Sequence, residues 1–296
     1  MRNICHLSPD TTVIGNETPI ITSSALSVAH DNTERTLHSE LDFSQTLFKD
    51  HPKCYWIWKY RLWILNQTIT NLPIAVARAI WDKELLLISK LLFRDSRNFH
   101  AWAFRRHVVA RLESTDLQGS SMIEPEFDFT TRMIRRDLSN FSAWHHRTQL
   151  IPRLLLERNL GDEGRREFLE GEFDFVRGAL NIGPDDQSLW YYHKYLILIL
   201  TGSSTYRSVS FQLPWTDRKT YISHEIAKAQ ELTEDYAGMK WVWEALVEQT
   251  LAMLQLDGQP GGTQDRANLS LWLQNLKILD GKRIRRWQHL ENSLGL

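Results

Sequence analysis

The side chains that could do chemistry in this chain are few, and their spacing does not build a catalytic centre. His145 and His146 are adjacent, so on a helix they point about 100 degrees apart, and we expect both to pack on a repeated helical face. Asp185 and Asp186 could suggest a magnesium-binding pair. No further acid follows them at helical spacing, so we interpret this pair as helix-capping residues.

Cysteine content and charge set the class of protein. Cys5 and Cys54 are the two cysteines, and their wide spacing offers no zinc framework and no disulfide framework. Two lone cysteines are typical of a reducing compartment. A net charge of −1 gives no general attraction to nucleic acid. No signal peptide is predicted, and the apolar tract "YLILIL" is far shorter than the roughly 20 residues of a membrane helix. We therefore expect a soluble cytoplasmic protein with no metal and no cofactor of its own.

One short phrase recurs: an aromatic residue, Trp three positions later, and Arg three positions after that. Its copies are "CYWIWKYR", "NFHAWAFR" and "NFSAWHHR", and a fourth, "DQSLWYYHK", has His in place of Arg. The successive Trp residues lie 44, 42 and 46 positions apart. This period indicates stacked helical units of the longer α-solenoids. The phrase residues are Tyr55, Trp58, Arg61, Trp102, Arg105, Trp144, Arg147, Trp190 and His193.

The elements that carry the phrase are expected to be paired helices. Residues 1–36 show no helical period and are predicted to be loop or disordered. A capping box of Ser39 and Asp42 predicts the first helix start. Pro152 should kink its helix or end it near Leu150. Asn98, Asn140 and Asp185 are expected as N-caps. The later helices are predicted at 55–65, 75–94, 98–112, 124–137, 141–157, 163–181, 186–200, 218–233, 238–255, 264–278 and 282–293.

Helical geometry gives the phrase a structural role. Residues three apart are neighbours on the helix surface, so each Trp shares a stripe with the Arg that follows it. We expect the Trp to fill the space between the two helices of a hairpin. The Arg has five donors for carbonyls left unpaired at a neighbouring helix end or turn. Both positions are therefore interpreted as architectural.

At these residues the chain resembles a known family. "HPKCYWIWKYRLWIL", "RNFHAWAFRRHVV", "SNFSAWHHRTQLIPRLL" and "PDDQSLWYYHKYLI" look like the repeats of the protein prenyltransferase α subunits. The local variants resemble those of the Rab geranylgeranyltransferase α subunit, in its compact fungal form. The resemblance covers about residues 39–293 and includes a degenerate last copy, "MKWVWEAL", with Trp241.

The resemblance implies an all-α fold, a right-handed α-α superhelix of helical hairpins over residues 39–296. Residues 1–38 contain no Trp, whereas the family normally begins with one more repeat. We expect this segment to be disordered, or to be a mispredicted exon that replaces that repeat.

The resemblance also implies a function. The chain would scaffold a catalytic β subunit that carries zinc and binds geranylgeranyl diphosphate. The heterodimer would transfer geranylgeranyl to C-terminal cysteines of Rab GTPases presented by a Rab escort protein. Aligned on Trp102, the family positions that approach the diphosphate and the peptide are Arg97 and Phe99 here. Arg97 keeps a cation that could stabilise the leaving diphosphate, whereas Phe99 lacks the hydroxyl group found in relatives.

Two other interpretations stay open from the sequence. The chain could be the α subunit shared by farnesyltransferase and type I geranylgeranyltransferase. It could also be a noncatalytic α-solenoid scaffold that has lost its β partner.

Overall fold

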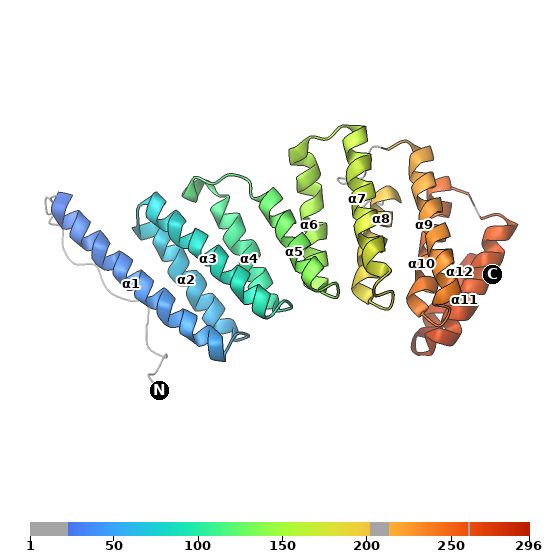
Figure 1. Cartoon of the computed structure of the whole chain (residues 1–296), viewed down its shortest axis with the longest axis horizontal. Helices are drawn as coiled ribbons and strands as arrows, with labels where there is room; N and C mark the ends of the chain where they lie inside the picture. Colours follow the sequence, from blue (N-terminus) through green and yellow to red (C-terminus); the bar gives the residue numbers. More distant parts are fainter. Residues whose placement is uncertain (1–22, 202–212, 260) are drawn as a thin grey trace. The chain divides into compact units, whose positions relative to one another are not determined.

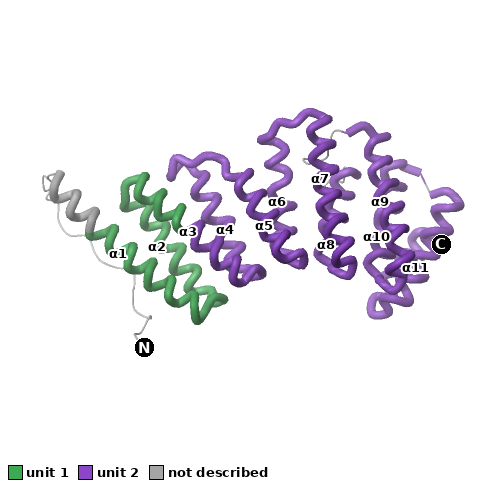
Figure 2. The backbone as a smooth tube through the Cα atoms, in the orientation of Figure 1, with its two compact units in different colours: residues 1–83 green, residues 84–296 purple. Residues whose placement is uncertain are grey.

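The computed structural model is mainly α-helical (Figure 1). It describes residues 23–201, 213–259 and 261–296, and their side chains from residue 32 onward. No strand occurs in these ranges. The chain divides into two compact units, residues 1–83 (unit 1) and residues 84–296 (unit 2), coloured separately in Figure 2. The predicted all-α class, with repeated helical hairpins, is confirmed.

Unit 1 contains the hairpin of α1 (Ser23–Asp50) and α2 (Tyr55–Asn71), followed by the first part of α3 (Ile74–Arg94). The ring of Phe48 packs on Trp58, with ring centroids 4.3 Å apart. The predicted helix start at Ser39 is wrong, because Ser39 lies in the middle of α1 and so cannot form a capping box with Asp42. The loop prediction for residues 1–36 is wrong from Ser23 onward. Residues 1–22 lie outside the described residues.

Unit 2 contains the rest of α3 and a run of helical hairpins. The two helices of each later hairpin pack on each other, and α6, α8 and α10 also pack on their neighbours in this series. The predicted helices of this unit are confirmed, with bounds that differ by no more than three residues. The helices are α4 (Phe99–Leu112), α5 (Ile123–Arg136), α6 (Phe141–Arg158), α7 (Asp162–Leu180), α8 (Gln187–Thr201), α9 (Trp215–Asp235), α10 (Lys240–Asp257), α11 (Thr263–Leu279) and α12 (Ile284–Leu294).

Short polar side chains start several of these helices. The side chain of Asn98 accepts hydrogen bonds from the first free amides of α4, and Asn140 does the same for α6. These bonds satisfy backbone donors that a helix start leaves unpaired. At α8 the side chain of Asp186 accepts from the amide of Ser188 at 2.7 Å. The cap is therefore one residue later than the predicted Asp185.

Pro152 lies inside α6, which continues to Arg158, so the predicted end near Leu150 is wrong. A proline has no amide hydrogen, and the carbonyl four residues earlier therefore loses its helical donor. That carbonyl belongs to Thr148, and it accepts a hydrogen bond from the hydroxyl of Tyr195 on α8 at 3.0 Å. A side chain of the next hairpin thus satisfies the group that Pro152 leaves unpaired.

Candidate functional site

The Trp of the phrase fixes the turn inside each hairpin. Its indole donates a hydrogen bond to the carbonyl six residues earlier, with N···O distances of 2.7 to 3.0 Å. All four rings are buried. Because the acceptor lies in the turn that precedes the helix, the ring anchors the start of each second helix. The pairs are Trp58 with Pro52, Trp102 with Ser96, Trp144 with Leu138, and Trp190 with Pro184.

The fifth copy is shifted from its predicted register. The indole of Trp243, not of Trp241, donates to the carbonyl six residues earlier, that of Ala237, at 2.8 Å. Trp243 also lies three residues after the start of α10 at Lys240, as the other four Trp residues do in their helices. Leu246 consequently occupies the Arg position, and it is completely buried. The assignment of Trp241 to this position is wrong, because "WVW" offers two Trp residues to choose from.

The Arg of the phrase is buried and pairs with the first helix of the next hairpin. Arg105 donates to both carboxylate oxygens of Glu126 on α5, at 2.9 and 2.5 Å. Its guanidinium lies 3.4 Å from the ring centroid of Phe129. Arg147 forms the same bidentate pair of hydrogen bonds with the Glu172 carboxylate on α7, at 2.7 and 2.5 Å. Carboxylates are therefore the main acceptors of these two arginines, where the sequence led us to expect carbonyls.

Arg61 in unit 1 has a carbonyl among its acceptors, but that carbonyl lies inside α1 and not at a helix end or turn. Arg61 donates to the carbonyl of Leu41 at 2.6 Å and to the hydroxyl of Ser44 at 2.8 Å, both on α1. Arg61 is 3% exposed. Its cation thus also serves to join the two helices of its own hairpin.

Sequence reasoning missed the acidic partner, although a signal for it is present. A Glu lies 18 residues before each of the five turn-anchoring Trp residues. In three hairpins this Glu opens the sequence Glu–Leu/Phe–Asp–Phe. The four copies from Glu84 onward are at most 5% exposed. The five residues are Glu40, Glu84, Glu126, Glu172 and Glu225.

The buried carboxylate of Glu126 is held in its charged form. Burial alone would raise the pKa of Glu126, but hydrogen bonds from His146 and Arg105 outweigh burial and lower it. The Nε2 atom of His146 lies 3.3 Å from the Glu126 carboxylate. Tyr192 occupies the equivalent place beside Glu172 and donates its hydroxyl to that carboxylate. Burial, together with the charge of Glu172, raises the pKa of Tyr192 well above its ordinary value.

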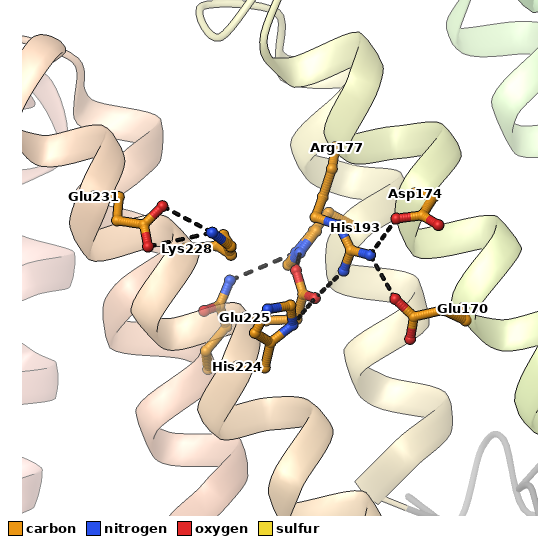
Figure 3. Close-up of polar contacts among 9 residues, drawn as sticks. Glu170, Asp174, Arg177, His193, His224, Glu225, Lys228 and Glu231 are labelled. Atoms are coloured by element: carbon orange, nitrogen blue, oxygen red, sulfur yellow. Dashed lines mark hydrogen bonds and ion pairs between the residues drawn. The ribbon is translucent and has the colours of Figure 1, made fainter.

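In the fourth phrase the replacement of Arg by His is compensated by another arginine. The Nε2 atom of His193 lies 2.8 Å from Glu225 on α9. Arg177 of α7 donates to the other oxygen of Glu225 at 2.5 Å, and also contacts Glu170 and Asp174 (Figure 3). Hydrogen bonding and charge from His193 and Arg177 lower the pKa of Glu225 against the opposing effect of burial. Glu225 thus keeps a guanidinium partner from a different helix.

The first aromatic residue of the phrase faces outward. Phe99 is 65% exposed and Phe141 and Tyr55 are each 50% exposed. In unit 2 the exposed rings continue into a stripe, because Tyr191 lies 6.3 Å from Phe141 and 6.2 Å from Trp241 between ring centroids. A groove of about 310 Å³ between α6 and α8 borders this stripe. These rings form what we call the aromatic stripe: Phe141, Tyr191 and Trp241.

Of the predicted diphosphate and substrate contacts, Arg97 lies in the turn before α4 and Phe99 is the first residue of α4. The Arg97 side chain is 60% exposed, and its nearest described ion-pair partner is Asp137, 3.5 Å away in the turn before α6. Asp137 also accepts from the hydroxyl of Ser96. The guanidinium therefore keeps donors directed to solvent that could bind an anionic group. Their role in catalysis stays a prediction.

The other chemistry-bearing residues are dispersed. His146 is buried against Glu126, whereas His145 is exposed and stacks on Phe141. Within the described ranges, no three His, Cys, Asp or Glu side chains are arranged to hold a metal ion. The residues of this chain that the structure describes therefore do not fit a zinc ion. No helix there is both long and apolar enough to cross a membrane.

This geometry defines an α-solenoid of helical hairpins whose second helices begin at Trp-anchored turns. The description "Protein prenyltransferase alpha subunit repeat" matches residues 37–68, 81–112, 123–154 and 169–200. These four segments contain the first four Trp anchors and the residues that follow them. The chain belongs to the protein prenyltransferase α subunit repeat family.

Similar proteins agree with this assignment, and a solved structure shares the fold. A geranylgeranyl transferase type-2 subunit alpha from Saccharomyces cerevisiae is 39% identical over 158 residues, which are 53% of this chain and 46% of the relative. The subunit of that name from Schizosaccharomyces pombe is 32% identical over 217 residues, 72% of this chain and 62% of the relative. The chain thus spans less than two thirds of either relative. A Candida albicans protein geranylgeranyltransferase-I complexed with GGPP shares the fold, with a TM-score of 0.55, 19% identity, and coverage of 91% of this chain and 76% of that one.

Proposed function

We propose that this chain is the α subunit of a Rab geranylgeranyltransferase. The heterodimer transfers geranylgeranyl from its diphosphate to C-terminal cysteines of Rab GTPases that a Rab escort protein presents. This proposal is supported by the similarity to type-2 α subunits. Its physical basis is one observation: in the first three phrase copies the turn-anchoring Trp is buried, while the aromatic ring three residues before it is exposed.

That observation predicts a protein-binding surface. Large apolar rings exposed at a repeated position mark an interaction site, because isolated surface hydrophobics do not recur at a fixed register. Aromatic side chains are also enriched at interfaces. In unit 2 the rings of Phe99 and Phe141 start neighbouring second helices. We assign this face to the catalytic β subunit, which would cover the rings on assembly.

The chemistry of prenyl transfer suggests which subunit carries each catalytic group. Prenyl transfer to a thiol needs an activated thiolate and a site that neutralises the diphosphate. We assign zinc and the isoprenoid cavity to the β subunit, and we expect this chain to be inactive alone. Arg97 is the side chain of this subunit that we expect at the diphosphate, where its charge would stabilise the leaving group. Phe99 would contact substrate through its ring.

Co-expression with a type-2 β subunit tests the proposal. We expect a stoichiometric complex that modifies a Rab GTPase only when an escort protein is added. Phe141→Ala should weaken the complex. Leu156→Ala is the matched control, because Leu156 is 78% exposed near the other end of the same helix.

The alternatives give different results. If no prenyltransferase β subunit binds, the chain is a noncatalytic scaffold and the proposal fails. If the dimer modifies short CaaX peptides without an escort protein, the chain belongs with the farnesyl and type I geranylgeranyl enzymes.

A further inference from the structure

A basic side chain on α4 lies on the exposed face of the helix that begins with Phe99. Ala103 and Arg106 follow Phe99 by four and seven residues, and Ala110 follows Arg106 by four, so the four side chains form one stripe. All four are exposed. The small alanines on either side of Arg106 leave its guanidinium open to an approaching group. Arg106 therefore belongs to the surface that we assign to the β subunit.

Arg106 has no counterion among the described residues. No hydrogen bond or ion pair within those ranges reaches its side chain. Neighbouring atoms nevertheless displace water from the guanidinium, and this burial lowers the pKa of Arg106. A cation that loses hydration without gaining a partner is destabilised, and pairing with a carboxylate offsets that loss. The physical chemistry of Arg106 therefore calls for an acidic group from outside the described residues.

Comparable cations of later hairpins receive an acid from this chain. Arg106 lies four residues after the Trp anchor of its phrase, and Lys194 of α8 occupies the same position in the fourth phrase. Lys194 donates to the carboxylate of Glu248 on α10. On α12, Arg286 lies 3.1 Å from Glu244. At the position of Arg106 the corresponding carboxylate has to come from another molecule.

His145 of α6 lies close to Arg106. The two helices pack together at this level, with 5.6 Å between the ring centroids of Trp102 and His146. Burial, and after it the charge of Arg106, lowers the pKa of His145. His145 also lines the groove of about 310 Å³ between α6 and α8, and it stacks on Phe141 of the aromatic stripe. Arg106 and His145 thus disfavour each other's positive charge, and an anionic group beside them would favour both.

We propose that Arg106, with His145 beside it, binds an Asp or Glu side chain of the catalytic β subunit. This inference rests on the proposed function, because it names the group that the β subunit presents to one point of the assigned face. The carboxylate accepts two hydrogen bonds from the guanidinium, as Glu126 does from Arg105. Apolar atoms of the same β-subunit segment cover Phe99 and the aromatic stripe.

The diphosphate is assigned to a different position on this surface. Arg97 lies in the turn before α4, whereas Arg106 lies seven residues beyond Phe99, about 10 Å along the helix axis. A diphosphate bound at Arg97 therefore leaves Arg106 for another anion. The planar fork of a guanidinium matches a carboxylate with two hydrogen bonds, so a protein side chain suits this site.

Binding of the full chain to a type-2 β subunit, followed by surface plasmon resonance at low and high salt, tests the charge. We expect at least a tenfold rise in Kd for Arg106→Gln and a weaker dependence of Kd on salt, because a charge pair across the interface is lost. Arg106→Lys should keep the salt dependence because it keeps the cation. Arg135→Gln is the matched control: it removes the same charge from an exposed position on α5 and should leave Kd unchanged.

A cross-link tests the identity of the partner group. A water-soluble carbodiimide joins a lysine amine to a carboxylate in contact with it, and takes up the released water to become a urea. In the co-expressed Arg106→Lys heterodimer, we expect an amide bond between position 106 and an Asp or Glu of the β subunit, located by mass spectrometry. The Arg135→Lys heterodimer should show no such bond at position 135.

Two results would overturn the inference and leave the proposed function intact. Equal Kd values for the wild-type and Arg106→Gln chains would show that the β subunit does not bind at Arg106, and a raised KM for geranylgeranyl diphosphate in that variant would give Arg106 to the diphosphate. A cross-link from position 106 only to a carboxylate of this chain would show an internal partner. If the wild-type chain binds no β subunit, the proposed function fails and this inference fails with it. Unchanged circular dichroism and melting of each variant establish that a loss of binding is not a loss of folding.

Discussion

The hydroxyl of Tyr195 donates a 3.0 Å hydrogen bond to the carbonyl of Thr148, the group that Pro152 leaves without a helical donor. Tyr195→Phe should therefore lower the free energy of unfolding by about 0.5–1.5 kcal/mol, the net contribution of one hydrogen bond, because the bond is only partly buried. Pro152→Ala restores the helical amide. In the Pro152→Ala background, Tyr195→Phe should lower the free energy of unfolding much less. Urea unfolding of the wild type, the two single variants and the double variant measures this difference. An equal cost in both backgrounds would disprove the compensation.

This bond illustrates what the sequence could and could not predict. Hydrophobic spacing predicted the helices of unit 2 closely, because the apolar stripe of a helix is a local pattern. The effect of Pro152 was predicted wrongly because it depends on a residue 43 positions later on another helix. The start of α1 was missed because residues 23–38 lack a strong apolar period, whereas the structure continues the helix through them.

The phrase itself shows the same limit. The sequence identified Trp and Arg, but not the Glu residues that receive the arginines, because acceptor and donor lie 21 to 25 residues apart. Only the fixed interval of 18 residues between Glu and Trp reveals this partner. Trp241 was chosen over Trp243 because the register of a helix start is not visible in a local phrase.

The buried pair of Arg147 and Glu172 should be costly to break and cheap to replace. Arg147→Met leaves the buried carboxylate of Glu172 without its guanidinium partner, and we expect a loss of about 3–5 kcal/mol. Adding Glu172→Met should recover most of that loss, because two apolar side chains then replace the ion pair. Arg158→Met is the control: its pair with Glu124 is largely exposed and should contribute at most about 1 kcal/mol. If chemical unfolding showed that Arg147→Met and Arg158→Met lose the same free energy of unfolding, this view would be refuted.

Acid should weaken the protein partly through Glu126. Its pKa is lowered in the folded state, from an ordinary value of 4.5, by His146 and Arg105 against the effect of burial. The unfolded chain therefore binds the proton first, and the stabilisation present above pH 4.5 is lost as the pH falls through the lowered pKa. In Glu126→Gln, the unfolding free energy should fall less steeply over this acidic range. A slope equal to that of the wild-type chain would contradict the assignment.

The exchange of Arg for His at position 193 should depend on Arg177. Glu225 already receives a guanidinium from Arg177, so His193→Arg would place a second cation at one buried carboxylate. We expect a loss of about 1–3 kcal/mol for this single change, comparable with burying an unpaired polar group. His193→Arg combined with Arg177→Met restores a single arginine at Glu225 and should regain stability. If thermal melting shows that the double variant is less stable than His193→Arg alone, an arginine at position 193 does not substitute for Arg177.

Arg97 should affect turnover rather than assembly. Its side chain is 60% exposed, and its contact with Asp137 is 3.5 Å long, so its removal should change stability little. If it stabilises the departing diphosphate, Arg97→Ala should lower kcat of the assembled heterodimer by about 10²–10³, as for other donors that stabilise developing charge. Arg97→Lys should retain part of the activity because it keeps the cation. Arg135→Ala, at an exposed arginine near the end of α5, is the control. If Arg97→Ala and the wild type have equal turnover and equal β-subunit binding, Arg97 is an exposed residue with no role in the reaction.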